Sequence, residues 1–351
     1  MEEYRYSVVD VRGTPREMGR QHGEQRREVI FNEAKQGVDR FAQSRQLSTE
    51  KALSLIGLYE RQFRDYAPHL IEEMEGVAEA AGLSFLDVLY LNTRYDLAAL
   101  PSGCTAFAVG ADITANGGVI AGQNKDTVPL SADRMYLLRS HPSSGAGIML
   151  LTYPGEVGHI GLGMKGIAVF GNSLFVKEHP FGGTQNLVRR LMVEQENLEQ
   201  CEAILQRLGI NAPGNWMVAE RGGRVADFEV TGRRFRRLDG GRGILAHANH
   251  VLHPDLLEDE AYPTREVDSV PRYSRLKEQL EAKAGKLTVE DCKQALKDHA
   301  HEPNSICRHG GTIHNLPPIV TTSSLVADLA EGVLWLARGN PCLHAHIPFA
   351  F

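Results

Sequence analysis

The sequence lacks several features that would assign it to a major class of protein. No apolar run reaches the roughly eighteen uncharged residues that indicate a membrane-spanning helix. The 351 residues carry a net charge of −6, which argues against the basic stripe of a nucleic-acid-binding protein. The N-terminal stretch MEEYRYSVVD is acidic and has no apolar h-region. We therefore expect no membrane partner, no nucleic-acid partner and no secretory signal.

Cysteine is scarce, and several catalytic motifs are missing. The five cysteines are scattered and odd in number, so we expect free thiols in a reducing cytoplasm and not a disulfide framework. The chain has no GxxxxGK[ST] phosphate loop, no HExxH, no paired CxxC and no GxSxG elbow. A cofactor-dependent enzyme, a zinc protease of the common type and a serine hydrolase of the elbow type are therefore disfavoured, and no cofactor is expected.

What is present is the composition of an ordinary globular protein, with 42% apolar and 23% charged residues. The first hundred residues predict mainly helices. Thr14 to Glu17 form a capping box with proline at the first helical position, and helical spacing then covers 18–45 and 49–81. Ser84 with Asp87 begins a further helix.

From residue 104 onward the pattern changes to short β-rich runs separated by Gly, Asn or Ser. A helix is predicted at 185–208, followed by more strands, helices near 272–284 and 288–299, and a hairpin that turns at Glu331-Gly332. No repeat or linker divides the chain, so we predict a single domain over 1–351. Blocks of strands with helices between them predict the α+β class, with two packed sheets and helices outside.

One stretch, LPSGCTAFAVGAD at 100–112, raises the question of function. It places Cys104 at the start of an alternating strand, at the junction of the helical and β-rich halves. A lone cysteine beside small residues is most often a small buried hydrophobe. Against this, Gly103 before it permits close approach to its carbonyl, and polar residues recur at the ends of later strands.

Six motifs carry a family resemblance. In chain order they are GTPREMGRQHG (13–23), SGCTAF (102–107), GQNKD (122–126), GIAVFGNSL (166–174), HANH (247–250) and SICRH (305–309). Together they resemble the acyl-CoA:6-aminopenicillanic acid acyltransferase family, which belongs to the N-terminal-nucleophile hydrolases and is related to choloylglycine hydrolases. SGCTAF followed by GQN-x-D is the specific part. The resemblance implies a four-layer αββα sandwich of two mainly antiparallel sheets.

The resemblance also implies self-processing. The Cys104 thiol would attack the carbonyl of Gly103, and hydrolysis of the resulting thioester would leave two associated chains, 1–103 and 104–351. Cys104 then becomes an N-terminal residue whose α-amine, with a reference pKa of about 8, serves as the base for its own thiol.

Further site residues follow from the resemblance, residue by residue. Asp126 in GQNKD resembles the aspartate that contacts the α-amine, and Asn249 in HANH matches the oxyanion-hole asparagine. Asn172 in GNSL resembles the second asparagine of the choloylglycine relatives. Arg308 in SICRH matches the arginine that pairs with the catalytic aspartate. Lys125 departs from the pattern, because relatives often carry an aromatic residue there.

Several other polar residues are assigned no catalytic role. Arg94 and Asp96 are expected to be charges on a helix surface, although a position just before the cut leaves a role in processing open. A metal site is the main rival to the cysteine chemistry, on two sets of residues: His247, His250 and His253, and the C-x-H-x-H of Cys342, His344 and His346. The first set alternates between strand faces, and no metal is expected. His299, His301, His309 and His314 are expected to be surface or core histidines.

The predicted function is a self-processed cysteine amidohydrolase that cleaves the linear amide of an N-acyl compound through an acyl-enzyme on Cys104. An N-acyltransferase that uses a coenzyme A thioester is the alternative, since water exclusion from the pocket decides the acceptor. A degenerate member that binds a ligand without turnover is the non-enzymatic alternative. The expected partners are a small acyl substrate and the two fragments of the chain itself, and a homo-oligomer stays open.

Overall fold

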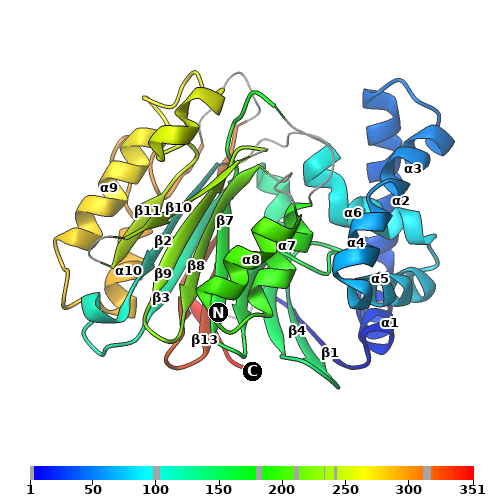
Figure 1. The fold of residues 1–351 in the computed structure, drawn as a ribbon, viewed down its shortest axis with the longest axis horizontal. Coiled ribbons are helices and arrows are strands. Elements are labelled where there is room, and N and C mark those ends of the chain that lie inside the picture. The colour runs from blue at the N-terminus through cyan, green and yellow to red at the C-terminus, as the bar shows by residue number, and fades with distance from the viewer. Residues whose placement is uncertain are drawn as a thin grey trace.

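The computed structural model describes residues 4–97, 103–178, 184–208, 213–232, 234–240, 243–310 and 318–351. Two β-sheets lie face to face at its centre, and helices cover both outer faces (Figure 1). The predicted α+β class and the four-layer αββα arrangement are confirmed.

The larger sheet has eight strands in the order β1-β4-β5-β6-β7-β8-β9-β10. Only β1 and β4 pair in parallel, and the other neighbours are antiparallel. Its strands are β1 (Val8–Gly13), β4 (Tyr136–Pro142), β5 (Ile148–Thr152), β6 (Ile160–Gly163), β7 (Ile167–Asn172), β8 (Gly214–Glu220), β9 (Val225–Val230) and β10 (Phe235–Asp239).

The smaller sheet has six strands in the order β11-β2-β3-β12-β13-β14, and all neighbours are antiparallel. Its strands are β2 (Gly103–Val109), β3 (Ile120–Thr127), β11 (Ile244–His247), β12 (Val320–Asp328), β13 (Val333–Arg338) and β14 (Ile347–Phe349). The β12–β13 hairpin turns at Glu331-Gly332 as predicted, and Gly332 has the positive φ of 66° that the turn requires.

The helical layers lie on opposite sides of the sandwich. On the smaller sheet lie α9 (Ser269–Glu281) and α10 (Val289–Ala295), at the left of Figure 1. On the larger sheet, in the middle of the view, lie α7 (Gln185–Val193) and α8 (Leu198–Leu208). At the right of the view lie α1 (Pro15–Gln25), α2 (Arg27–Ser44), α3 (Thr49–Gly57), α4 (Glu60–Tyr66), α5 (Pro68–Ala81) and α6 (Phe85–Leu97). No helix among the described residues is both long enough and apolar enough to cross a bilayer.

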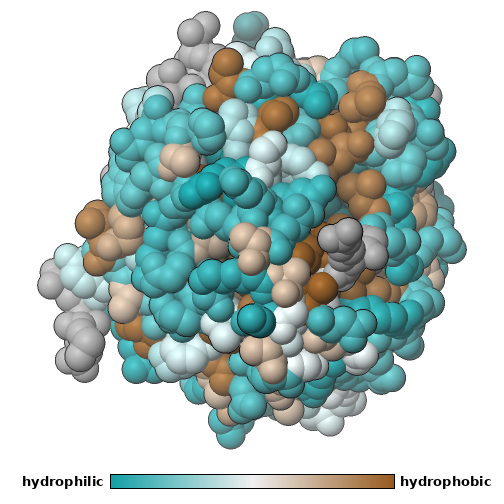
Figure 2. All heavy atoms as spheres, turned by 90° about the vertical axis from the view of Figure 1, so that its left-hand side faces the viewer, coloured by the Kyte–Doolittle hydropathy of each residue, from teal (hydrophilic) through white to brown (hydrophobic). Residues whose placement is uncertain are grey.

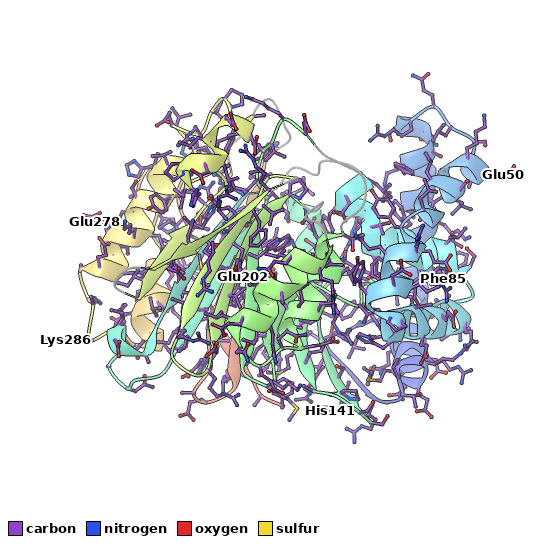
Figure 3. All side chains as sticks on the ribbon, in the orientation of Figure 1. Glu50, Phe85, His141, Glu202, Glu278 and Lys286 are labelled. Atoms are coloured by element: carbon purple, nitrogen blue, oxygen red, sulfur yellow. The ribbon has the colours of Figure 1, made fainter. Side chains whose placement is uncertain are left out.

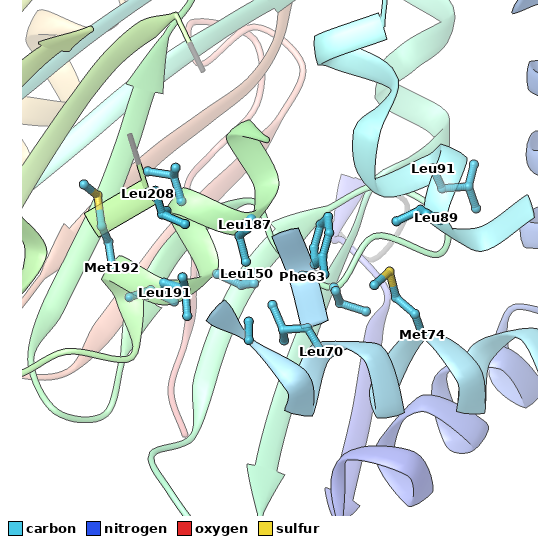
Figure 4. Packing of buried hydrophobic residues seen from close by; sticks show 14 of the residues in the cluster. Phe63, Leu70, Met74, Leu89, Leu91, Leu150, Leu187, Leu191, Met192 and Leu208 are labelled. Atoms are coloured by element: carbon cyan, nitrogen blue, oxygen red, sulfur yellow. The ribbon is translucent and has the colours of Figure 1, made fainter. Parts of the chain in front are cut away.

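Three apolar clusters hold the layers together. The inter-sheet core includes Ala106, Ala121, Phe170 and Leu325. A second cluster joins the larger sheet to the helices, and Figure 4 shows Phe63 and Leu70 facing Leu150 and Leu187 across it. A third cluster packs α9 and α10 on the smaller sheet through Phe107, Leu276, Leu280 and Val326. Burial of apolar area in these layers stabilises the sandwich by roughly 25 cal/mol per Å².

The outer face of the α9–α10 layer is solvated. On α9, Leu276 and Leu280 are fully buried, whereas Glu278 between them is exposed and points away from the sheets in Figure 3. The surface seen from this side is largely hydrophilic, with scattered apolar side chains (Figure 2). This is the helical periodicity expected of a layer with one buried face.

Some sequence predictions need correction. The first hundred residues are mainly helical as predicted, but the strand VVDVRG was not predicted and forms β1 at a sheet edge beside β4. The helix predicted at 185–208 is two helices, since the chain turns between Val193 and Leu198. The predicted capping box at Thr14 and Glu17 is present.

Candidate active site

Cys104 is the second residue of β2, and its side chain faces the space between the sheets. Side chains alternate along a strand, and Cys104 shares its face with Ala106 and Ala108 of the inter-sheet core. Its direct neighbour across the sheet is Lys125 on β3, and the next pair is Gly103 with Asp126. Cys104 is 3% exposed and lies in the wall of a pocket.

The backbone of Cys104 is held on both sides. Its N–H donates to Oδ1 of Asn249 at 2.9 Å. Its carbonyl oxygen accepts from Nη1 of Arg272 at 2.6 Å. The peptide nitrogen that would become the α-amine therefore already has an oxygen partner in the intact chain.

Asn249 follows β11 and is fully buried. Its backbone N–H donates to the Ser269 hydroxyl at 2.7 Å, and its side-chain nitrogen donates to the Ser173 carbonyl at 2.9 Å. Its Oδ1 accepts from both Cys104 and Arg272. A side-chain amide has two N–H donors, so Asn249 has a second hydrogen besides the one donated to Ser173, although Asn249 does not itself line the pocket.

Asp126 lies on the opposite face of β3 from Lys125 and is fully buried. Its Oδ1 accepts from the Thr321 hydroxyl at 2.7 Å. Its Oδ2 has no hydrogen-bond partner among the described residues and lies 3.4 Å from the position that a Cβ on Gly103 would take. Burial raises the pKa of Asp126, and the charges of Arg308 and Arg272 oppose that rise.

Arg308 lies between two carboxylates in the layer under α9. Its Nε is 3.8 Å from Oδ2 of Asp126, and its Nη2 donates to Asp268. Its backbone N–H donates to the Thr321 hydroxyl at 2.9 Å, the same hydroxyl that binds Asp126. The structure therefore brings Asp126 and Arg308 together as an ion pair, while the side-chain hydrogen bond of Arg308 goes to Asp268.

Sequence reasoning missed Asp268 and Arg272. They are four residues apart at the start of α9, and Arg272 Nη2 lies 3.3 Å from Asp268. Burial opposes the charge on Asp268, but Arg272 and Arg308 outweigh it and lower the pKa of Asp268 to about 2. The predicted helix began at residue 272, which left Asp268 in a loop and hid the i,i+4 pair that would have indicated a charged face.

Asn172 ends β7 close to this group but turns away from it. Its side-chain nitrogen donates to the His247 carbonyl at 3.3 Å, and its Oδ1 is buried without a hydrogen-bond partner among the described residues. Its neighbours Gly171 and Ser173 line the pocket, and Asn172 itself does not.

The pocket beside Cys104 has a volume of about 240 Å³ and is rich in cations and tyrosines. Its lining includes Arg40, Arg94, Lys125, Arg134 and Arg189, together with Tyr90, Tyr95, Tyr153 and one carboxylate, Glu33. The expectation that Arg94 and Asp96 are surface charges is wrong. Arg94 is buried and pairs with Glu33 and Glu156, and half-buried Asp96 accepts from the Gln185 backbone N–H.

Two of these cations are buried and have no carboxylate partner within 4 Å among the described residues. Lys125 lies with its Nζ 5.6 Å from the centre of the Tyr153 ring, and Arg189 binds Gln185 and His159. Burial lowers the pKa of Lys125. Burial raises the pKa of the Cys104 thiol, and the charge of Lys125 opposes that rise.

The rival metal sets are dispersed. His247 binds Glu229 at 2.8 Å and His250 binds Ser269 at 2.7 Å, while His253 accepts from the Asp255 backbone. In the second set, His344 stacks on Tyr4 and His346 contacts the Ser324 hydroxyl, apart from Cys342.

The sequence model of one protein family matches most of the chain. It is described as acyl-coenzyme A:6-aminopenicillanic acid acyl-transferase and covers residues 113–342. The chain belongs to this family. The resemblance drawn from the six motifs is confirmed, and membership makes the protein an enzyme of acyl transfer. The matched range contains Asp126, Asn172, Asn249 and Arg308 and begins after Cys104.

Individual proteins are similar to the chain as well. The acyl-coenzyme A:6-aminopenicillanic-acid-acyltransferase 40 kDa form of Emericella nidulans is 26% identical over 330 residues, which is 88% of each chain. Among solved structures, a mutant of the conjugated bile acid hydrolase from Clostridium perfringens has a TM-score of 0.48 at 13% identity, covering 71% of this chain and 97% of its own. Penicillin V acylase from Agrobacterium tumefaciens has a TM-score of 0.46 at 12% identity, covering 67% and 83%.

Proposed function

We propose that the protein is a self-processing cysteine amidohydrolase that cleaves the linear amide bond of an N-acyl compound. The observation that carries this proposal is the placement of Cys104. Its thiol faces a pocket, its backbone nitrogen is bound by Asn249, and a carboxylate oxygen of Asp126 without a hydrogen-bond partner among the described residues lies beside Gly103.

The first step is cleavage between residues 103 and 104. The deprotonated sulfur of Cys104 bonds to the carbonyl carbon of Gly103, and the C–N bond breaks as the nitrogen takes up a proton. Water then hydrolyses the thioester, which gives Gly103 a carboxylate and restores the thiol. The products are a chain of residues 1–103 and a chain of residues 104–351, held together as one αβ pair by the packing of the layers.

The second step repeats this chemistry on substrate. The new α-amine keeps Oδ1 of Asn249 as an acceptor, and Oδ2 of Asp126, which has no hydrogen-bond partner among the described residues, would accept a second of its hydrogens. These two bonds would orient the lone pair of the amine toward the thiol. The amine takes the thiol proton, and the thiolate attacks the substrate carbonyl. The remaining N–H of Asn249 donates to the oxyanion. The amine of the substrate then leaves with the proton that the α-amine took from the thiol, and water hydrolyses the acyl-enzyme to release the acid.

Other groups position these residues. Arg272 fixes Asn249 and the Cys104 carbonyl, and Asp268 holds Arg272 and Arg308 in place. The charge of Arg308 opposes the rise in the pKa of Asp126 that burial causes. We assign Asn172 to the support of β11 through its bond to His247.

The charge of the pocket favours a substrate that carries a carboxylate. Lys125 and Arg189 are buried cations without a carboxylate partner among the described residues, and a substrate anion would form charge-assisted hydrogen bonds with them. We therefore infer an N-acyl amide with an acidic group near the scissile bond. The cytoplasm stays the proposed compartment, on the scattered and unpaired cysteines of the sequence.

The family relationship supports a second candidate, transfer of the acyl group from a coenzyme A thioester to an amine. Both reactions pass through the same acyl-enzyme. They differ in the acceptor of the acyl group, which is water in the hydrolase and an amine in the transferase. The test is to incubate the protein with N-acyl amino acids, digest it after acid quenching, and identify the modified peptide by mass. The proposal expects the acyl group on the sulfur of Cys104 and release of free acid in water alone. Acyl transfer only when an amine and an acyl-coenzyme A are both supplied would favour the transferase, and no acyl adduct in either case would favour the degenerate binder.

A further inference from the structure

Two cysteines and two histidines meet on the outer side of the smaller sheet, away from the pocket. They are His299 after α10, Cys307 and His309 on either side of Arg308, and Cys342 after β13. Their candidate ligand atoms all lie within 4.8 Å of one another. No other group of this kind is found among the described residues.

Four of the separations between these atoms are close to the edges of a zinc tetrahedron. Sγ of Cys307 is 3.5 Å from Sγ of Cys342, and Nε2 of His299 is 3.1 Å from Nε2 of His309. Nε2 of His309 is 3.2 Å from Sγ of Cys342 and 3.8 Å from Sγ of Cys307. With Zn–S near 2.3 Å and Zn–N near 2.0–2.1 Å, tetrahedral zinc places its ligand atoms about 3.3–3.8 Å apart.

The surroundings also suit a closed metal site. The side-chain nitrogen of Asn340 lies 3.4 Å from Sγ of Cys307, a contact that stabilises a thiolate, and donates to the Arg308 carbonyl at 2.8 Å. The Cys307 N–H donates to the Asp298 carbonyl at 2.9 Å, so the segment that carries Cys307 is bonded to the residue before His299. Four protein ligands of the Cys₂His₂ type leave no open position, which is typical of a structural zinc site and not of a catalytic one.

We propose that His299, Cys307, His309 and Cys342 bind one zinc ion, and that this ion positions Arg308 for the active site. Arg308 is the residue between two of the ligands, and its side chain points inward to Asp268 and Asp126. A metal that fixes residues 307 and 309 would fix the backbone from which Arg308 reaches the carboxylate beside Gly103. The two histidines are exposed and Cys342 is partly exposed, so the ion can enter from solvent.

The test measures metal in the full-length protein purified without added chelator. Elemental analysis is made of the wild type, of Cys342→Ser and of Cys201→Ser. Cys201 is a buried free cysteine in α8 and serves as the matched control. We expect about one zinc per chain in the wild type and the control, and a loss of about tenfold or more in Cys342→Ser.

Two further measurements keep the proposal falsifiable if Cys342→Ser does not fold. Cobalt(II) added to chelator-treated wild type should give the ligand-field bands of a tetrahedral site with thiolate charge transfer. Asn340→Ala should retain the fold and lose about 10–100-fold in zinc affinity in chelator competition. Wild type that takes up neither zinc nor cobalt overturns the proposal. So does zinc content unchanged by Cys342→Ser, or peptide mapping that finds Cys307 and Cys342 joined as a disulfide.

Discussion

Cys104 and Asn249 are joined by a hydrogen bond of 2.9 Å from the backbone nitrogen of the cysteine to Oδ1 of the asparagine. The contact links the first residues of β2 to the loop after β11. Arg272 donates to the asparagine oxygen and to the carbonyl of the same cysteine, so the two residues are held as one unit.

Substitution of Asn249 should separate its two roles. Asn249→Ala loses the oxyanion donor and the amine acceptor, and turnover should fall by about 10²–10³-fold. Asn249→Asp keeps an acceptor for the α-amine but has no N–H, so it should process itself and still turn over substrate slowly. Rates of chain cleavage and of acid release measure the two effects separately. Full turnover in Asn249→Asp would contradict the donor role.

Removal of Arg308 should destabilise the protein strongly. Arg308→Met leaves Asp126 and Asp268 buried without the cation that pairs with them. Removing one partner of a buried ion pair typically lowers the free energy of unfolding by about 3–5 kcal/mol. Urea unfolding of Arg308→Met, Asp268→Asn and the double variant measures the loss and the coupling between the two residues. We expect the double variant to be less destabilised than the sum of the singles. Strict additivity would show that the two side chains do not interact.

The stability of the protein should fall in mildly alkaline solution through His247. Burial opposes a charge on this ring, but Asp227 and Glu229 outweigh it and raise the pKa of His247 to about 9. Because the pKa is raised in the folded state, the charged ring stabilises the folded protein fully at pH values below the unfolded pKa of about 6.5. That stabilisation is lost as the pH rises through the folded pKa of about 9. The difference in unfolding free energy between wild type and His247→Gln should therefore be largest near about pH 6 and shrink toward about pH 10. A difference that stays constant with pH would contradict a charged His247.

Lys125 should set the reactivity of the nucleophile. Its charge is the main influence that opposes the rise in the pKa of the buried Cys104 thiol. Lys125→Met should move the pH profile of Cys104 alkylation to higher pH, whereas Lys125→Arg should keep the profile near that of the wild type. Peptide mapping with iodoacetamide follows the modification of Cys104 itself. An unshifted profile in Lys125→Met would show that the lysine has no effect on the thiol.

Arg189 should determine the preference of the enzyme for a substrate that carries a carboxylate. Loss of one charge-assisted hydrogen bond is worth about 1.5–3 kcal/mol, so Arg189→Met should weaken binding of a carboxylate-bearing amide by about 10–100-fold. The matched neutral amide should change little. Competition between the acid and its methyl ester, measured in wild type and in the variant, gives the selectivity directly. Equal losses for both compounds would remove the assignment of an acidic substrate.

The sequence predicted the sandwich because its strands carry strong local signals. β2 and β12, for example, are almost wholly buried runs bounded by turn residues. The edge strand β1 was missed because its alternation is short and carries Asp10 and Arg12 on the outer side. The break between α7 and α8 was missed because helical periodicity continues through residues 194–197.

The candidate site could be predicted only where a local motif marks it. Cys104 and Asp126 stand in the contiguous motifs SGCTAF and GQNKD, and the antiparallel pairing of β2 with β3 sets them one register position apart. Lys125 has its role through tertiary contacts that no spacing in the sequence indicates, and the i,i+4 spacing of Asp268 and Arg272 does not show that they reach Asn249 and Arg308. The same holds for His299 and Cys342, which come from separate segments and meet only after the smaller sheet has formed.

The central claim is that Cys104 is a nucleophile that releases itself as a new N-terminus. The intact mass of the purified wild-type chain beside Cys104→Ala tests it most directly. Two fragments in the wild type that meet between Gly103 and Cys104, and one full-length chain in the variant, are the predicted result. A single uncut chain in both would contradict the account and leave Cys104 as a small buried residue of the inter-sheet core.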